Sequence, residues 1–139
     1  MTFDDLPQNF RDLSLDDPVL RSDAIDLFVS LADREAGSFT IVLLDDGHRV
    51  LQPVVISELG EAEPAEVVAS LRRVLSELDT GGIVAALGRD GSPLFSDRDR
   101  TFHQLTVDLC RDLGLDLLGF YLATPATVRE MPDHLRMAS

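Results

Sequence analysis

Residues 81–124, GGIVAALGRDGSPLFSDRDRTFHQLTVDLCRDLGLDLLGFYLAT, decide the fold of this 139-residue chain. The apolar run Ile83–Leu87 predicts a buried strand, and Leu115–Thr124 predicts a second one. Between them lie a polar loop and an amphipathic helix, which is the order of an α/β unit. Functional residues of such a unit usually lie where the first strand ends and the helix begins. We therefore expect any site to fall within residues 87–99.

The helix of this unit has clear boundaries in the sequence. Ser96 is a good N-cap residue, and Asp99 follows three residues later, as in a capping box with Asp in place of Glu. Gly114 is suited to end the helix. The residues spaced for its buried face are Phe102, Leu105, Leu109 and Leu113. Cys110 falls near this face, so we expect it in the core.

A β-hairpin is predicted earlier in the chain. Phe39–Leu44 (FTIVLL) is continuously apolar, which is typical of a buried strand. Residues 45–48 are turn formers, and Arg49–Ser57 is expected to be the second strand. Because Pro53 has no N–H group for a ladder hydrogen bond, we expect a bulge or an edge strand there.

Two further helices are expected in the first half of the chain. The first begins near Asp17 and Pro18, a cap residue followed by a proline, and extends to Gly37. Its predicted buried face consists of Leu20, Ala24, Leu27, Phe28 and Leu31. The second begins at Glu63 and Pro64. Its apolar stripe consists of Val67, Leu71, Val74, Leu75 and Leu78.

The chain is predicted to form one domain with two polar ends. Residues 17–125 are expected to be a single α/β domain, residues 1–16 an N-terminal arm and residues 126–139 a C-terminal tail. The apolar residues of the arm are Leu6, Phe10, Leu13 and Leu15. Because they show no clear period, we expect the arm to dock on the body or on a second chain. The expected partner is a second copy, giving a homodimer, or another protein.

The composition argues against several classes of function. There are 25 acidic and 12 basic side chains, the basic ones all arginine, and the formal net charge is −13. Such a negative field opposes binding to nucleic acids and to anionic membranes. A single cysteine excludes an internal disulfide and a cysteine-rich zinc site. Without a signal pattern or an apolar run of about 20 residues, the protein is expected to be cytoplasmic.

Several segments resemble the RadC-like branch of the JAB/MPN (JAMM) metalloprotease fold. They are similar to its first hairpin, its glycine and Pro-x-Glu-Val helix start, the strand before its metal motif, and its last strand. These segments are Leu43–Leu51, Gly60, residues 64–67, Ile83–Leu87 and Leu117–Leu122. The resemblance covers roughly residues 39–124. It implies a mixed sheet flanked by helices, JAB/MPN-like, with layers arranged as in cytidine deaminase.

The resemblance also implies that a metal motif has been lost. The family binds zinc through His-x-His and, about seven residues later, Ser-x-x-Asp. Ser96 and Asp99 are present here. The histidine positions are occupied by Leu87 and Arg89, or by Ala86 and Gly88 if the loop has no deletion. A leucine cannot ligate zinc, and an arginine repels it.

Two other features of the family are also replaced. A glutamate of the first hairpin is its general base, and the residues near that position here are Gln52, Pro53 and Val54. The Asp-His pair of the RadC last strand is replaced by Gly119 and Phe120. We therefore expect a catalytically inactive domain with no metal and no cofactor, whose role is contact with other proteins.

Two alternative functions remain open. The first is binding of an anion or small molecule at the start of the helix, where a phosphate or carboxylate is favoured. Its residues are Arg89, Arg98 and Arg100. Because acidic residues alternate with these arginines, a solvated salt-bridged surface is the competing interpretation. The second alternative is a hydrolase with a rebuilt acidic centre. Its residues are Asp90, Asp97, Asp99 and His103, and outside such a centre His103 is expected on the surface.

Overall fold

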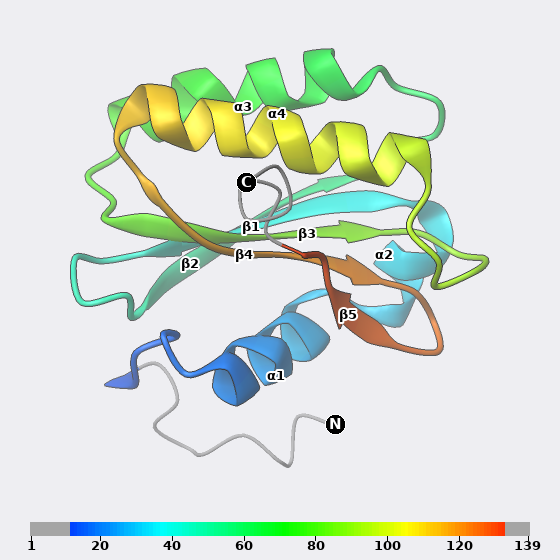
Figure 1. Ribbon diagram of the computed structural model, residues 1–139, viewed down its shortest axis with the longest axis horizontal. Helices are drawn as coiled ribbons and strands as arrows, with labels where there is room; N and C mark the ends of the chain where they lie inside the picture. The colour runs from blue at the N-terminus through cyan, green and yellow to red at the C-terminus, as the bar shows by residue number, and fades with distance from the viewer. Residues whose placement is uncertain (1–11, 133–139) are drawn as a thin grey trace.

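The computed structural model describes residues 12–132, which form a five-stranded mixed sheet between helices (Figure 1). The strand order across the sheet is β2-β1-β3-β4-β5. The strands are β1 (Ser38–Leu44), β2 (Val50–Ser57), β3 (Gly82–Gly88), β4 (Asp116–Ala123) and β5 (Val128–Glu130). The helices are α1 (Pro18–Phe28), α2 (Leu31–Ala36), α3 (Pro64–Glu77) and α4 (Asp97–Leu113). The predicted fold class, an α/β domain with a mixed sheet flanked by helices, is confirmed.

Two hydrophobic cores lie on opposite faces of the sheet. Helices α3 and α4 cover one face, and α1 covers the other (Figure 1). β1 and β3 are buried along their whole length because they contribute side chains to both cores. In β1, for example, Phe39 and Ile41 face α3 and α4, whereas Val42 faces α1. The continuous apolar runs in the sequence therefore predicted these central strands correctly.

The predicted hairpin is confirmed, and so is the expected edge position of Pro53. β1 and β2 pair antiparallel, with Val42 opposite Pro53, and β2 is the outermost strand on its side. β3 pairs antiparallel with β1 and parallel with β4. This parallel pair places the loop after β3 and the start of α4 at one end of the sheet. No helix within residues 12–132 is both long and apolar enough to cross a membrane.

The single helix predicted for residues 17–37 is wrong, because the chain breaks at Val29 and Ser30. Ser30 begins a separate helix, α2, by accepting a hydrogen bond from the backbone N–H of Asp33 at 3.1 Å. Leu31, expected on the buried face, is 57% exposed. A serine followed three residues later by an acidic residue is a helix-start signal. The apolar period across residues 20–31 concealed it.

Parts of both polar ends belong to the body of the domain. Leu15 is completely buried in the core beneath α1, and Ser14 forms an antiparallel bridge with Arg49. Of the other docking residues expected in the arm, Leu13 is half-buried, whereas Leu6 and Phe10 lie outside the described residues. At the other end, where a polar tail was expected, Val128–Glu130 forms β5 and pairs with β4.

A buried arginine joins the two ends to the sheet. Arg21 in α1 donates from Nε to the Tyr121 hydroxyl at 2.9 Å and from Nη1 to the Leu15 carbonyl at 3.0 Å. Its Nη2 lies 3.4 Å from Oε1 of Glu130 in β5. Space for this cluster depends on Gly119, because a Cβ there would lie 2.9 Å from Oε1 of Glu130. One guanidinium therefore connects the residue 15 segment, β4 and β5.

A histidine makes a second connection to the N-terminal segment. His48 lies in the turn between β1 and β2, with Nδ1 2.7 Å from Asp16 and Nε2 3.1 Å from Asp116. A neutral imidazole has one N–H group, so only the protonated ring donates to both carboxylates. The hydrogen bond to Asp16 has the largest effect and, with the bond to Asp116, raises the pKa of His48.

We expect this connection to stabilise the protein below neutral pH and to weaken as pH rises. Because the folded-state pKa of His48 lies above the ordinary 6.5, its contribution is complete below 6.5 and is lost through the raised value. His48→Asn, which tolerates the φ of 61° at this position, is the suitable comparison. Wild type should have a higher unfolding midpoint than His48→Asn below pH 6.5, and this difference should shrink as the pH rises above 6.5. A pH-independent difference would contradict this assignment.

Candidate functional site

The residues expected to form a site do meet at one end of the sheet. The hollow there has a volume of about 200 Å³ and lies between the end of β3, the start of α4 and the loop before α3. Its lining residues are Leu59, Gly60, Leu87, Gly88, Arg89, Ser96, Arg98 and Asp99. All four residues proposed as the remnant of a metal site, Leu87, Arg89, Ser96 and Asp99, are therefore neighbours. We call this hollow the β3–α4 site.

The start of α4 is fixed by a capping box, as the sequence predicted. The Ser96 hydroxyl accepts from the backbone N–H of Asp99 at 3.1 Å. The Asp99 carboxylate in turn accepts from the backbone N–H of Ser96 at 2.8 Å. Two otherwise unpaired backbone donors are satisfied in this way. The reciprocal bonds also turn the Asp99 carboxylate toward the loop that follows β3.

Arg89 forms a two-point ion pair with this carboxylate. Its Nε lies 3.0 Å from Oδ1 of Asp99, and its Nη2 lies 2.8 Å from Oδ2. The remaining donors contact backbone carbonyls of the loop, those of Asp90 at 3.0 Å, Ser92 at 2.8 Å and Leu94 at 2.9 Å. A guanidinium has five N–H donors, and these contacts use all five. Arg89 is therefore part of the loop structure.

Both members of the pair are charged in the folded protein. Burial of Asp99 acts to raise its pKa, but the hydrogen bonds from Arg89 and Ser96 outweigh it, so the pKa is lowered. The hydrogen bond with Asp99 raises the pKa of Arg89. The Asp99 side chain is almost inaccessible to water, whereas that of Arg89 is 26% exposed. The pair places a fixed positive group against the one carboxylate inside the site.

The other two arginines of the proposed anion site point elsewhere. Arg98 donates from Nη2 to the Ala62 carbonyl at 2.9 Å, and its guanidinium lies 5.4 Å from the centre of the Phe102 ring. Arg100 forms an exposed ion pair with Asp97 at 3.3 Å. Arg98 lines the β3–α4 site, but Arg100 does not. The three guanidinium groups thus do not converge on one position.

The residues of the proposed acidic centre are also not brought together. Within residues 12–132 there is no group of three or more His, Cys, Asp or Glu side chains placed to hold a metal ion. The expectation of a surface position for His103 is wrong, because this side chain is buried. Its ring stacks on Phe120 with ring centres 4.9 Å apart. The predicted helical face ran through Phe102 and Leu105, and His103 lies at its margin.

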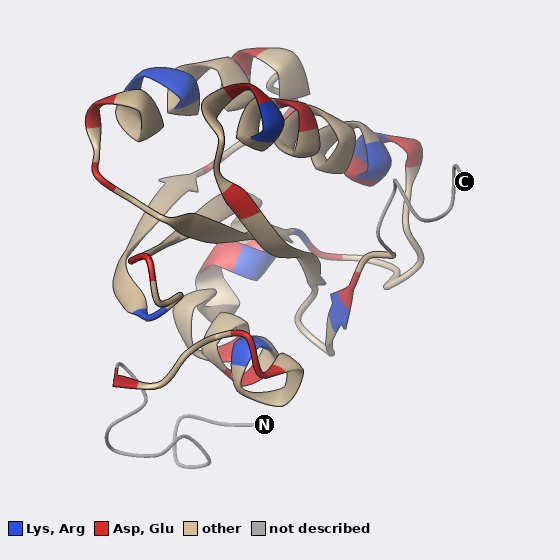
Figure 2. Ribbon diagram, turned by 60° about the vertical axis from the view of Figure 1, so that its left-hand side comes forward, with Lys and Arg blue, Asp and Glu red and all other residues tan. Residues whose placement is uncertain are grey.

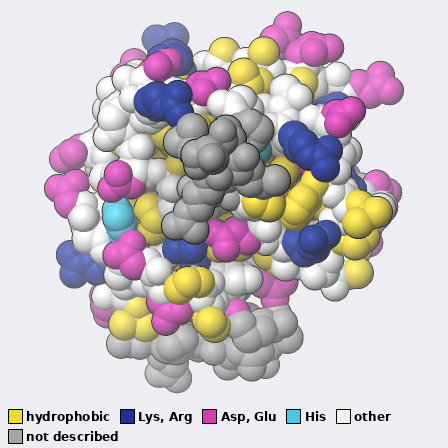
Figure 3. Space-filling view, in the orientation of Figure 1, with side chains coloured by type: hydrophobic (Ala, Val, Ile, Leu, Met, Phe, Trp, Pro, Cys, Tyr) yellow, Lys and Arg dark blue, Asp and Glu magenta, His cyan; other side chains and the backbone are white. Residues whose placement is uncertain are grey.

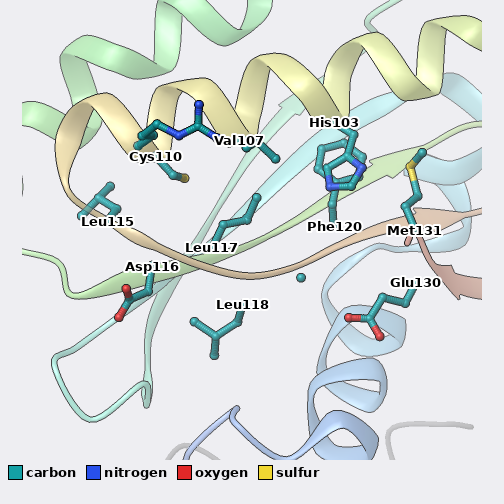
Figure 4. Close-up of a pocket in the computed structure, with 12 residues that line it drawn as sticks. His103, Val107, Cys110, Leu115, Asp116, Leu117, Leu118, Phe120, Glu130 and Met131 are labelled. Carbon is teal, nitrogen blue, oxygen red and sulfur yellow. The ribbon is translucent and has the colours of Figure 1, made fainter. Parts of the chain in front are cut away.

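His103 faces a different hollow, shown in Figure 4. This pocket, about 280 Å³, lies between α4 and β4, and Cys110 and Met131 also line it. Cys110 is in the core, as expected, and burial raises the pKa of its thiol to about 12. A thiol with such a pKa is not a nucleophile at neutral pH. Cys110 therefore does not provide this pocket with an activated nucleophile.

The register of the sheet also locates the two alternative alignments of the lost histidines. Leu87 faces the core beneath α3 and α4, on the side of Ser96 and Asp99, whereas Ala86 faces the core beneath α1. Leu87, near the end of β3, and Arg89, just after it, therefore both face the β3–α4 site. Of the two alignments, this one brings both positions to Asp99.

The hairpin residues expected near the general-base position are not level with the β3–α4 site. Across β1, Gln52 is level with Ile83, at the start of β3. The residue of β2 level with Leu87 is Ile56. Gln52 is thus four residues along β2 from the position level with Leu87, and Val54 is two residues from it. Ile56, like the residues expected there, has no side chain able to accept a proton.

Comparisons with known proteins give no family for this chain. No protein-family model matches it, and no curated protein matches it either. The interpretation of the β3–α4 site therefore depends on its own geometry.

Proposed function

We propose that this chain is a catalytically inactive, JAB/MPN-like interaction domain of the RadC-like type. The observation that carries the proposal is the ion pair of Arg89 and Asp99. In the resemblance, Asp99 is the carboxylate ligand of zinc and Arg89 stands in a histidine position. Here the same carboxylate is neutralised by a guanidinium of its own chain. The positive charge that a metal supplies in the family is supplied by the protein.

The residues of the site do not fit a zinc ion. A catalytic zinc needs three protein ligands and an open position for water. Leu87 offers no donor atom, and Arg89 offers only N–H donors, which repel a cation. Both oxygens of Asp99 are already bonded to Arg89. We therefore derive no hydrolytic step at this site.

The arrangement of elements supports the JAB/MPN-like interpretation. The order in the chain is two helices, hairpin, helix, strand, helix and two strands, with the proposed metal-motif strand β3 beside the last long strand β4. Gly60, the glycine of the resemblance, lines the β3–α4 site and has a φ of 52° that favours glycine. The capping box at Ser96 retains the Ser-x-x-Asp spacing for a structural purpose.

The loop after β3 supports a role in contact with other proteins. Arg89 bonds three of its carbonyls, and Arg129 donates to a fourth, that of Pro93, at 2.8 Å. The loop so fixed presents Leu94, whose side chain is 71% exposed. A rigid loop with an exposed apolar side chain binds a partner with little loss of conformational entropy. On the face shown in Figure 3, basic and acidic side chains are interspersed and do not form a patch of one sign.

The zinc content of purified full-length protein tests this proposal. Because the site already contains its own cation, elemental analysis should find no stoichiometric zinc, even after expression in zinc-supplemented medium. About one zinc per chain, retained through gel filtration, would contradict the proposal. A gain of stability on addition of zinc, measured by thermal unfolding, would contradict it equally.

A further inference from the structure

The side of β4 that faces away from β3 is only partly covered. β5 pairs with residues 121–123 of β4, and the backbone N–H of Met131 extends this pairing by donating to the Phe120 carbonyl at 2.8 Å. The pairing stops there. Among the residues that the structure describes, no strand pairs with this side of residues 116–119. Such an open edge is a template for another extended segment.

An apolar hollow lies beside this open edge. It is the pocket of about 280 Å³ between α4 and β4. Its apolar lining residues are Val107, Cys110, Leu115, Leu117, Leu118, Phe120 and Met131. In Figure 4, Leu115 and Leu117 lie toward one end of the hollow and Met131 lies toward the other. Val107, Leu115 and Leu117 are only half-buried, so apolar surface remains uncovered at the end away from Met131.

We infer that residues 133–139 of the same chain continue antiparallel along this edge of β4, and that Leu135 fills the hollow. These residues follow directly on Pro132, and Met131 is already hydrogen-bonded to β4. In an antiparallel pair, the residue after a hydrogen-bonded one directs its own N–H group away from the partner strand. Pro132, which has no N–H group, therefore fits this register without losing a hydrogen bond.

The spacing of side chains along an extended segment brings Leu135 to the hollow. Side chains alternate between the two faces of a sheet, and Met131 lies on the face covered by α3 and α4. Leu135, four residues later, falls on the same face, about 13 Å further along β4. Leu115 and Leu117 line that end of the hollow. A leucine side chain placed there removes apolar surface from water.

Charge and tethering favour this segment over a second copy of the chain as the occupant. The chain carries a net charge of −13, and its acidic side chains are spread over helices and loops around the sheet (Figure 2). Two copies therefore repel one another. Residues 133–139 contain one acidic and one basic side chain, Asp133 and Arg136, so this segment adds no net negative charge. A tethered segment is also present at an effective concentration on the order of millimolar.

Methyl NMR spectroscopy of the full-length protein tests this inference directly. Nuclear Overhauser contacts should connect the methyl groups of Leu135 with those of Leu115 or Leu117. In a sample mixed from differently labelled chains, these contacts should occur within one chain and not between chains. Absence of the contacts would overturn the inference. Contacts found between chains would assign the hollow to a second copy and would overturn it equally.

Cys110 provides a second readout, because it is the only cysteine of the chain and lines the hollow. Leu135→Asp should make its thiol react about tenfold faster with a thiol reagent under native conditions, since a carboxylate does not enter an apolar hollow. Val19→Asp is the matched control and should react as wild type does. It adds the same charge at a position that is 65% exposed, on α1 at the opposite face of the sheet. Equal rates in wild type and Leu135→Asp would contradict the inference. Neither measurement depends on zinc content, so a failure here is distinguishable from a failure of the proposed function.

Discussion

Replacement of Arg89 by methionine should lower the free energy of unfolding by about 3 kcal/mol at neutral pH. The variant leaves the Asp99 carboxylate buried with its hydrogen bond from the Ser96 backbone N–H but without the guanidinium that neutralises it. It also removes the donors for three carbonyls of the loop after β3. Removal of one partner of a buried ion pair costs more than the pair itself contributes, because the other charge stays desolvated. Chemical denaturation provides the measurement.

A double variant separates the charge effect from lost packing. In Arg89→Met with Asp99→Asn, the buried charge is gone and the amide still accepts from Ser96, so most of the lost stability should return. Arg100→Met, which removes only an exposed ion pair, is the control and should change stability little. If Arg89→Met behaves like this control, the pair does not neutralise the site.

The pH dependence of this loss has a defined sign. In wild type the pKa of Asp99 is below its ordinary 3.8, so its contribution is present above 3.8 and is lost as pH falls through the lowered value. In Arg89→Met, burial still acts to raise the pKa of Asp99 and is opposed only by the hydrogen bonds from Ser96, so acid protonates the carboxylate more readily than in wild type and relieves the unpaired charge. The difference between the two proteins should therefore shrink on acidification. A difference that grows in acid would contradict the assignment.

Arg21→Met should also cost about 3 kcal/mol, through a different loss. Its guanidinium is the hydrogen-bond partner of the buried Tyr121 hydroxyl and of the Leu15 carbonyl, and it contacts Glu130. Methionine fills part of the space but donates no hydrogen bond, so these buried acceptors are left desolvated. The residue 15 segment and β5 should become easier to open than the rest of the sheet.

Hydrogen exchange can distinguish this local effect from general destabilisation. The N–H groups of Leu15 and Met131, which bond His48 and Phe120, should exchange faster in Arg21→Met by a larger factor than those of β3. Arg72→Met, which breaks only the exposed pair with Asp112, is the matched control. Equal acceleration in all strands would show that Arg21 does not hold the two ends.

The central strand β1, the start of α4 and the edge strand β2 could be predicted from the sequence, because each depends on residues that are close together in the chain. Phe39–Leu44 is apolar throughout because both faces of β1 are covered. The capping box depends on two residues three positions apart, and such local geometry is visible in a sequence. Pro53 similarly predicted an edge, since a central strand has no place for a missing donor.

The features that escaped prediction depend on contacts between distant segments. β5 is a strand of three residues whose partner, β4, ends before a tight turn, and its composition is that of a polar loop. His103 is buried because Phe120 lies beneath it, 17 residues later in the chain. The Arg89 and Asp99 pair was visible only as alternating charges, a pattern shared with solvated surfaces. The two hydrogen bonds between these side chains form only because the end of β3 and the start of α4 meet in the fold.

Restoration of two histidines tests the central interpretation most directly. Leu87→His combined with Arg89→His would return two imidazoles to the side of β3 that faces Asp99, and it removes the competing guanidinium. Arg89→His alone, which restores one imidazole and leaves Leu87 without a donor atom, is the control, because a side chain at Gly88 would collide with Ser38. The measurement is zinc content by elemental analysis of wild type and both variants. We predict about one zinc per chain in the first variant and no stoichiometric zinc in the other two proteins. Stoichiometric zinc in wild type, or none in the Leu87 and Arg89 variant while it remains folded, would contradict the account.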